Sequence, residues 1–230
     1  AAAAEPTNPE PHIRLARAYY FLSDGHLRFE IEDEDDRKIK MGEMFGEGQY
    51  HGEKALLVMS AEFKQARESD VAVEEAVKSL PKEAVPAVYW WATNLGKWAA
   101  AEGFITLLAN KDKVFSMMDF CVKTDEDYFF AAPHRYFGAY YTKIPLPSGD
   151  QERSRKHFDI SLKKAPNYLS TRVLMAEYHA IKFQDRDMYA TQLKYVLDAD
   201  PNVIPELTPE HAVEKRKAKQ MLAEMDDHFE

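Results

Sequence analysis

DQERSRKHFDISLKKAPN (150–167) and DRDMYATQLKYVLDADPN (185–202) are the two segments that decide the fold. Each ends in a Pro-Asn step, and the prolines, Pro166 and Pro201, stand 35 residues apart. The positions 12, 8 and 5 residues before each proline share one helical row: Ser154, Phe158, Ser161 and Tyr189, Leu193, Val196. Small and aromatic residues in such a row are typical of the second helix of a tetratricopeptide-like repeat. The pattern predicts two equivalent helical hairpins.

Outward from these segments the chain favours helices throughout. Glycine is scarce, with 9 residues, which argues against a β-rich fold with many tight turns. A first helix is expected at about 12–24, continuing toward Ile31, and further helices at about 86–102, 111–123, 125–142, 150–164, 168–183, 185–199 and 208–227. The prediction is an all-α fold of stacked helical hairpins with cryptic tetratricopeptide-like repeats. A flexible leader over 1–10, without the apolar region of a signal peptide, precedes one helical-repeat domain over 11–230.

The last helix is expected to cap the stack, because a terminal repeat needs a polar outer face. Thr208 would cap its N-terminus, followed by Pro209 at the first helical position. Its inner stripe is predicted as Ala218, Leu222, Met225 and Phe229, and its outer face as Glu214, Lys215, Arg216, Lys217 and Lys219.

Two unusual stretches precede the repeats. Four glycines between Gly42 and Gly52 lack the Lys-Ser/Thr pair of a phosphate loop, and their spacing of four favours close helix–helix approach. The acidic run 30–36 lacks the glycine and the terminal glutamate of a calcium loop, so it is interpreted as a solvated loop or a frayed helix end.

Composition excludes several classes of protein. The 30 basic and 39 acidic residues give a net charge of −9, which argues against a nucleic-acid surface. No apolar run approaches the ~20 residues that span a bilayer. The one cysteine, Cys121, rules out a disulfide within the chain. It is expected to be buried on the 111–123 helix, in a stripe with Val114, Met117 and Met118.

Motifs of catalysis are missing from the sequence. The eight histidines are all more than five residues apart, which removes the HExxH motif, and no Gly-x-Ser-x-Gly elbow is present. We therefore expect no catalytic residue, no metal ligand and no cofactor. Paired carboxylates converging in space, as in a helical glycosidase, stay open as a minor alternative.

The aromatic residues are too widely spread for one core. Tyr89, Trp90 and Trp91 span ~200° of a helix, whereas a core-facing stripe is a little over ~100° wide. These helices are either sandwiched in a two-layer solenoid or buried on one side while lining a cavity on the other. Because polar residues recur beside the rings, a ligand cavity is predicted. Its candidate lining is Trp91, Trp98, His134, Tyr141 and Arg172, unless Arg172 merely pairs with an acid such as Glu177.

Several of these stretches resemble the T components (TatT lipoproteins) of TRAP, tripartite ATP-independent periplasmic, transporters. The similarity runs from about Ile13 to the C-terminus. It is carried by VPAVYWWATNLGKW (85–98), AAPHRYFGAYY (131–141), KHF (156–158), RVLMAEY (172–178), QDR (184–186), PEL (205–207) and KR (215–216).

The resemblance implies a homotrimer with a pore-like cavity in each protomer, whose partner is the periplasmic solute-binding P component. It also implies a periplasmic lipoprotein, held to the membrane through an N-terminal lipid anchor whose cysteine this sequence lacks. The leading hypothesis is thus a non-catalytic accessory protein that docks the P component and shelters a ligand. The alternative is a general tetratricopeptide adaptor that binds a peptide or protein in a concave groove, and an enzyme stands third.

Overall fold

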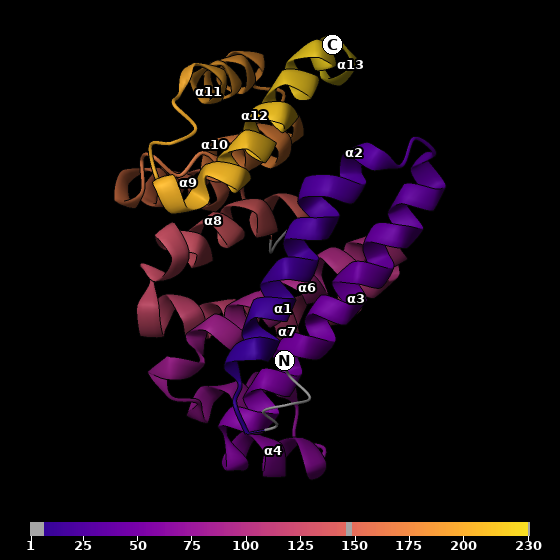
Figure 1. Ribbon diagram of the computed structural model, residues 1–230, viewed down its shortest axis with the longest axis vertical. Coiled ribbons are helices and arrows are strands. Elements are labelled where there is room, and N and C mark those ends of the chain that lie inside the picture. Colours follow the sequence, from indigo (N-terminus) through magenta and orange to yellow (C-terminus); the bar gives the residue numbers. More distant parts are fainter. Residues whose placement is uncertain (1–6, 146–148, 230) are drawn as a thin grey trace. The chain divides into compact units, whose positions relative to one another are not determined.

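Helices form all the regular secondary structure in residues 7–145 and 149–229, the part of the chain that the computed structural model describes (Figure 1). No strand occurs in these ranges, so the predicted all-α fold is confirmed. Two compact units can be distinguished, one ending at Tyr128 and the other beginning at Phe129, and each is described by itself. The predicted leader over 1–10 falls largely outside the described residues.

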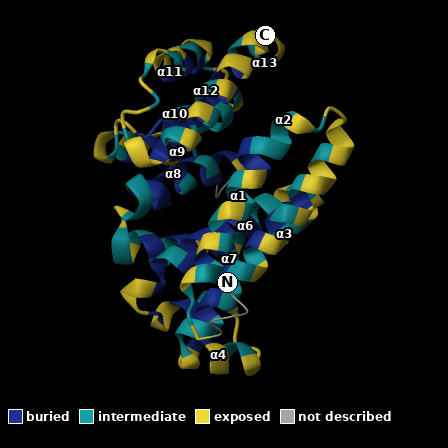
Figure 2. Ribbon diagram, in the orientation of Figure 1, coloured by how far each residue is buried: buried dark blue, intermediate teal, exposed yellow. Residues whose placement is uncertain are grey.

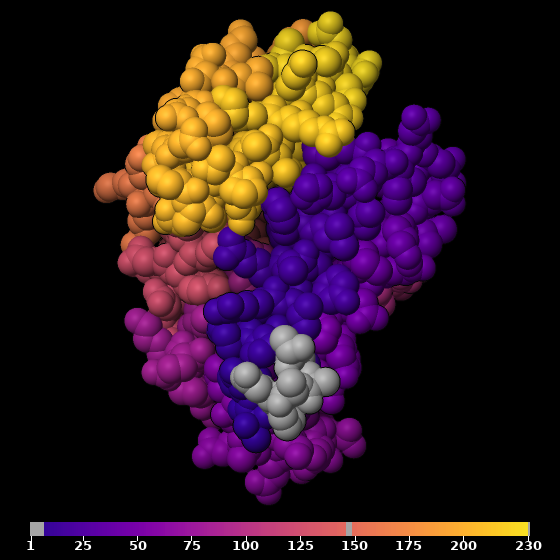
Figure 3. Space-filling view, viewed as in Figure 1, coloured from indigo at the N-terminus to yellow at the C-terminus, as the bar shows by residue number. Residues whose placement is uncertain are grey.

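The first unit contains three long helices that pack pairwise, α1 (Glu10–Leu22), α3 (Glu34–Met59) and α6 (Val85–Glu102). A fourth long helix, α7 (Phe104–Asp125), packs on α6. Short elements join them: the π-helix η1 (Ser23–Leu27), α2 (Arg28–Glu30), α4 (Ala61–Glu68), α5 (Val73–Ala76), η2 (Val77–Ser79) and η3 (Lys82–Ala84). In the space-filling view, α1 runs along the surface of this unit in indigo (Figure 3).

Helices α3 and α6 approach closely through glycines of α3. Gly42, Gly48 and Gly52 are buried. A methyl group at Gly52 would lie 2.6 Å from the Cα atom of Trp91, and one at Gly48 would collide with the Asn94 side chain. The close approach predicted from the glycine spacing is therefore confirmed, and α6 is buried along most of its length (Figure 2).

The second half of the acidic run begins a helix. The Asp33 side chain accepts a hydrogen bond from the Asp36 backbone N–H at 2.9 Å, and Glu34, Asp35 and Asp36 form the exposed first turn of α3. Carboxylates are stabilising there because the helix dipole places partial positive charge at its N-terminus. The run is therefore solvated as expected and includes a short loop at residues 31–33, but its second half is the ordered start of α3 and not a frayed helix end.

Cys121 lies where the periodicity predicts. Val114, Met117, Met118 and Cys121 are the buried residues of α7. Burial, followed by the charge of Asp125, raises the pKa of the Cys121 thiol, which keeps the group neutral. The helix itself starts earlier than expected, at Phe104, after Gly103 with a φ of 119°.

The helix predicted over 125–142 is broken. In α8 (Tyr128–Lys143), the residues Phe129, Phe130 and Ala131 are left-handed, with φ of 44°, 61° and 56°. Pro133 follows in the first turn of the right-handed helix, where its missing N–H costs no hydrogen bond. The two units meet in sequence at this turn.

The buried guanidinium of Arg135 holds the left-handed turn. It donates hydrogen bonds to the carbonyl oxygens of Phe130 at 3.0 Å and Phe129 at 3.3 Å, and to Thr171 Oγ1 at 3.5 Å. Its flat face lies 4.3 Å from the centre of the Tyr168 ring. Such contacts offset the strain of non-glycine residues in the left-handed region.

The second unit continues with α9 (Gln151–Lys164), α10 (Ser170–Leu174), the π-helix η4 (Met175–Ala180), α11 (Arg186–Asp198), η5 (Pro205–Leu207), α12 (Thr208–Ala223) and α13 (Met225–His228). The buried residues of α9 are Ser154, Phe158 and Ser161, and those of α11 are Tyr189, Leu193 and Val196. These are the two rows matched by sequence, and both helices end just before a Pro-Asn turn. Their assignment as tetratricopeptide-like repeats stays a prediction.

The C-terminal helix α12 differs from the expected cap. Ala218 and Phe229 are buried as predicted, but so are Glu214 and Lys217, expected on the outer face, which form an ion pair at 3.1 Å. The Lys215 ammonium donates to the carbonyl oxygens of Val196, Leu197 and Ala199, at the C-terminus of α11. The ion pair offsets the cost of burying Glu214 and Lys217, and the partly buried Lys215 has its own acceptors. Leu207, not Thr208, is the N-terminal flanking residue.

Candidate functional site

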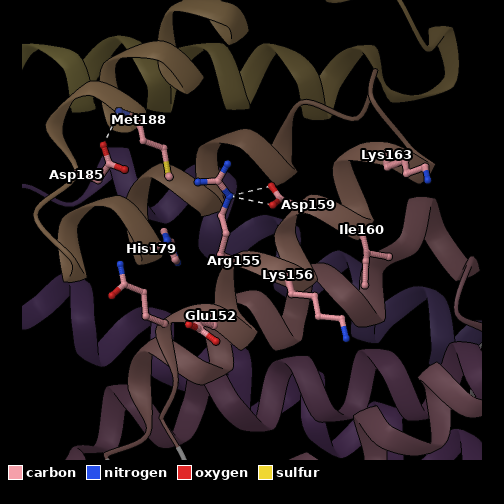
Figure 4. A pocket seen from close by; sticks show the side chains of 10 residues that line it. Glu152, Arg155, Lys156, Asp159, Ile160, Lys163, His179, Asp185 and Met188 are labelled. Atoms are coloured by element: carbon pink, nitrogen blue, oxygen red, sulfur yellow. Dashed lines mark hydrogen bonds and ion pairs between the residues drawn. The ribbon is translucent and has the colours of Figure 1, made fainter.

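An open polar groove of about 730 Å³ lies in the second unit, along the exposed face of α9 and beside the start of α11 (Figure 4). Its volume falls in the range of ~300–1,000 Å³ that is usual for ligand sites. The groove is lined by Gln151, Glu152, Arg155, Lys156, Asp159, Ile160, Lys163, His179, Asp185 and Met188.

Two aspartates define the helices that build the groove. Asp150 accepts a hydrogen bond from the Arg153 N–H at 2.9 Å and so caps α9. Asp185 accepts one from the Met188 N–H at 2.9 Å and so caps α11. Aspartate is a preferred N-cap because its carboxylate satisfies an unpaired N–H of the first turn. The caps fix where each helix begins and hence which side chains line the groove.

Opposite charges lie at different ends of the groove. Glu152 and Asp185 lie toward one end, while Lys163 lies at the other (Figure 4). Between them, Arg155 Nε lies 3.0 Å from each oxygen of the Asp159 carboxylate, so these two charges neutralise each other. The groove thus has an acidic and a basic end.

The groove includes a buried histidine whose tautomer is fixed. The Ser154 hydroxyl donates to the Gly138 carbonyl oxygen at 2.7 Å, so it has no hydrogen left for His179 Nδ1, which lies 2.8 Å away. His179 Nδ1 must therefore carry the hydrogen, and Nε2 is an acceptor. Burial, followed by the charge of Arg155, lowers the pKa of His179, which keeps the ring neutral. Within the described residues, Nε2 has no hydrogen-bond partner.

The predicted cavity residues Trp91 and Trp98 lie on α6, in the first unit. Trp91 is buried, with its ring edge-on to Phe63 at 6.1 Å, and it faces Gly52. Trp98 is partly buried and lies over Gly46. The Trp91 backbone and the Trp98 indole therefore lie against the glycines of α3.

His134 and Tyr141 lie on α8 and converge on His157. The Nδ1 atoms of His134 and His157 are 3.0 Å apart, so one ring donates and the other accepts. The Tyr141 and His157 ring centres lie 5.7 Å apart. Burial, followed by the charges of His134, Lys156 and Arg153, lowers the pKa of His157 to about 4. The His134 and Tyr141 side chains of this cluster are buried, and His157 is partly exposed.

Arg172 lies apart from that cluster, on α10. Its guanidinium stacks 3.6 Å from the centre of the Tyr195 ring and donates to Gln192 Oε1 at 2.7 Å. Glu177, the acid weighed as its partner, is not among these contacts. The structure thus brings His134 and Tyr141 together and leaves Arg172 separate, and none of the five predicted residues lines the groove.

Sequence reasoning missed the groove because its side chains resemble a solvated helix face. Glu152, Arg155, Lys156, Asp159 and Lys163 recur at helical spacings of three and four. This spacing shows in the sequence that the charged residues share one face of a helix. That His179 and Asp185 of the next hairpin line the same groove depends on how the helices pack. Among the described residues, no group of three or more histidine, cysteine, aspartate or glutamate side chains is arranged to hold a metal ion. None of the described helices is both long enough and apolar enough to span a membrane.

Comparison with known proteins identifies the family. The family model described as "TRAP transporter T-component" (TAtT) matches residues 14–229. No curated protein gives a significant match to the chain. The family consists of transporter accessory proteins, not of known enzymes, and is associated with the periplasm. Because the match covers nearly all of an all-helical chain, this protein belongs to the TRAP transporter T-component family.

Proposed function

We propose that this protein docks the solute-binding P component of a TRAP transporter and shelters a ligand, without catalysing a reaction. The observation that carries this proposal is the family match over residues 14–229. An exposed groove of mixed charge in the second unit supports the docking part of the proposal. We further propose that the protein is a periplasmic lipoprotein and a homotrimer, as the resemblance implies.

Trp91, Trp98, His134, Tyr141 and Arg172 remain our candidates for lining a ligand cavity. Flat rings supply apolar walls, and the Arg172 guanidinium presents donors that suit a carboxylate on the solute. Trp98 is the informative position, because its ring is only partly buried. Trp98→Ala should weaken solute binding and cost much less than the ~3–5 kcal/mol typical of a fully buried tryptophan. A large loss of stability with unchanged binding would remove Trp98 from the cavity.

Docking is tested by biolayer interferometry with the immobilised chain and the purified P component of the same transporter. We expect saturable binding of the P component and none of a solute-binding protein from an unrelated transporter. Absence of binding at micromolar P component, with the chain folded and trimeric by sedimentation equilibrium, would overturn the docking proposal. Sedimentation as a monomer under the same conditions would overturn the trimer.

A further inference from the structure

We propose that the groove of Figure 4 is the docking site for an extended segment of the P component, with a cationic side chain at the Glu152–Asp185 end and a carboxylate at the Lys163 end. This inference rests on the proposed function and assigns a surface to it. The groove supplies recognition by charge at both ends.

The length of the groove selects the kind of occupant. Glu152 and Lys163 are 11 residues apart on α9, which corresponds to about 16 Å at the helical rise of ~1.5 Å per residue. A compact zwitterion, such as a free amino acid, is too short to bridge the two ends. An extended chain advances ~3.3 Å per residue, so a segment of about five residues matches the span.

The middle of the groove suits a polypeptide backbone. His179 Nε2 is an acceptor because Nδ1 donates to Ser154, and it suits a backbone N–H of the segment. Ile160 and Met188 offer apolar contact beside it. The paired Arg155 and Asp159 neutralise each other there, and Lys156 adds one positive charge beside them. An extended segment exposes the N–H groups and alternating side chains that these features would bind.

The arrangement of charge favours a protein partner over a nucleic acid or an acidic membrane. A nucleic acid or an acidic membrane would need cations along the whole groove. Here Glu152 and Asp185 would repel phosphate groups at one end. A protein segment can carry both signs, and complementary charge fixes its direction in the groove.

The test exchanges the two ends without changing net charge. Glu152→Lys combined with Lys163→Glu inverts the polarity of the groove, and both side chains are exposed, so the fold should be retained. We expect affinity for the purified P component to fall at least tenfold, because two attractive pairs become repulsive. The matched control is Glu206→Lys with Lys194→Glu, an exchange of exposed side chains of the same unit outside the groove lining, which should leave affinity unchanged.

The outcomes are distinguishable. If the wild-type chain does not bind the P component, the proposed function fails. If it binds and the groove exchange binds equally well, the groove assignment fails while the function stands. Equal weakening by both exchanges would also overturn the assignment. Should the exchange variant unfold by circular dichroism, Lys156→Gln with Lys163→Gln replaces it, with an expected loss of at least threefold.

Discussion

Two glycines of α3, Gly46 and Gly52, are expected to respond in opposite ways to substitution by alanine. Gly52→Ala would place a methyl group 2.6 Å from the Trp91 Cα atom, whereas Gly46→Ala would place one at an ordinary 3.7 Å from the Trp98 ring. Overpacking costs ~1–3 kcal/mol, and alanine gains ~1 kcal/mol over glycine in a helix. We expect Gly52→Ala to lower the free energy of unfolding by about 1–2 kcal/mol and Gly46→Ala to raise it by about 0.5–1 kcal/mol.

Urea unfolding of the two variants measures this difference. Gly46→Ala is the matched control, since it makes the same chemical change on the same helix. If both substitutions stabilise the protein, α3 and α6 do not approach as closely as described.

His157 predicts a dependence of stability on pH. Its folded pKa is about 4, below the ordinary 6.5, so between these values the unfolded chain takes up a proton that the folded chain does not. The contribution of His157 to the free energy of unfolding is therefore fully present above pH 6.5 and is lost as the pH falls toward 4. Allowing for solvent screening of a partly exposed ring, the His157 contribution is on the order of 1–2 kcal/mol.

Urea unfolding at pH 7 and pH 4.5 tests this contribution. His157→Gln should lose less stability on acidification than the wild type. Identical pH dependence in His157→Gln and wild type would show that the ring is not held neutral by its surroundings.

Residue-level predictions from sequence succeed where periodicity decides the environment. The stripe of Val114, Met117, Met118 and Cys121 is buried as expected because helical spacing places these side chains on one face. The same reasoning fails for Glu214 and Lys217, which were expected on the outer face and are buried. Their burial depends on a mutual ion pair, which a polarity pattern assigns to the solvent face.

At the level of elements, the left-handed turn before Pro133 depends on Arg135. Arg135→Lys keeps the charge, but an ammonium cannot span the Phe129 and Phe130 carbonyl oxygens while stacking flat on Tyr168. We expect a loss of about 2–3 kcal/mol in the free energy of unfolding, from hydrogen bonds to a charged, buried donor. Arg153→Lys, at an exposed position of the same unit, should change it by less than ~0.5 kcal/mol. Equal, small effects of both changes in urea unfolding would contradict this role of Arg135.

Element boundaries follow from sequence where capping chemistry marks them. The expected helices at 86–102, 150–164 and 185–199 agree with α6, α9 and α11 to within a residue or so, and the aspartate caps and proline turns explain why. The break at Phe129–Ala131 was missed. No local pattern demands left-handed geometry there, because Arg135, which donates to the carbonyl oxygens of the turn, is itself held by Tyr168 and Thr171, more than 30 residues away.

At the scale of the whole molecule, sequence identified the family and the helical class but not the groove. Family membership rests on stretches spread along residues 14–229, which a sequence displays directly. The groove combines side chains of α9 with His179 of η4 and with Asp185 and Met188 at the start of α11, so its acidic end joins Glu152 to Asp185 from another hairpin. Proximity of this kind arises only on packing.

Hydrogen–deuterium exchange of the chain with and without saturating P component tests the central claim most directly. The account predicts slower exchange on binding, concentrated in α9 (Gln151–Lys164) and around His179–Met188, with the Glu152→Lys/Lys163→Glu exchange variant protected much less at the same P concentration. Protection confined to other helices would refute the groove as the docking site. Unchanged exchange along the whole chain, at a P concentration saturating for any micromolar complex, would contradict the account as a whole.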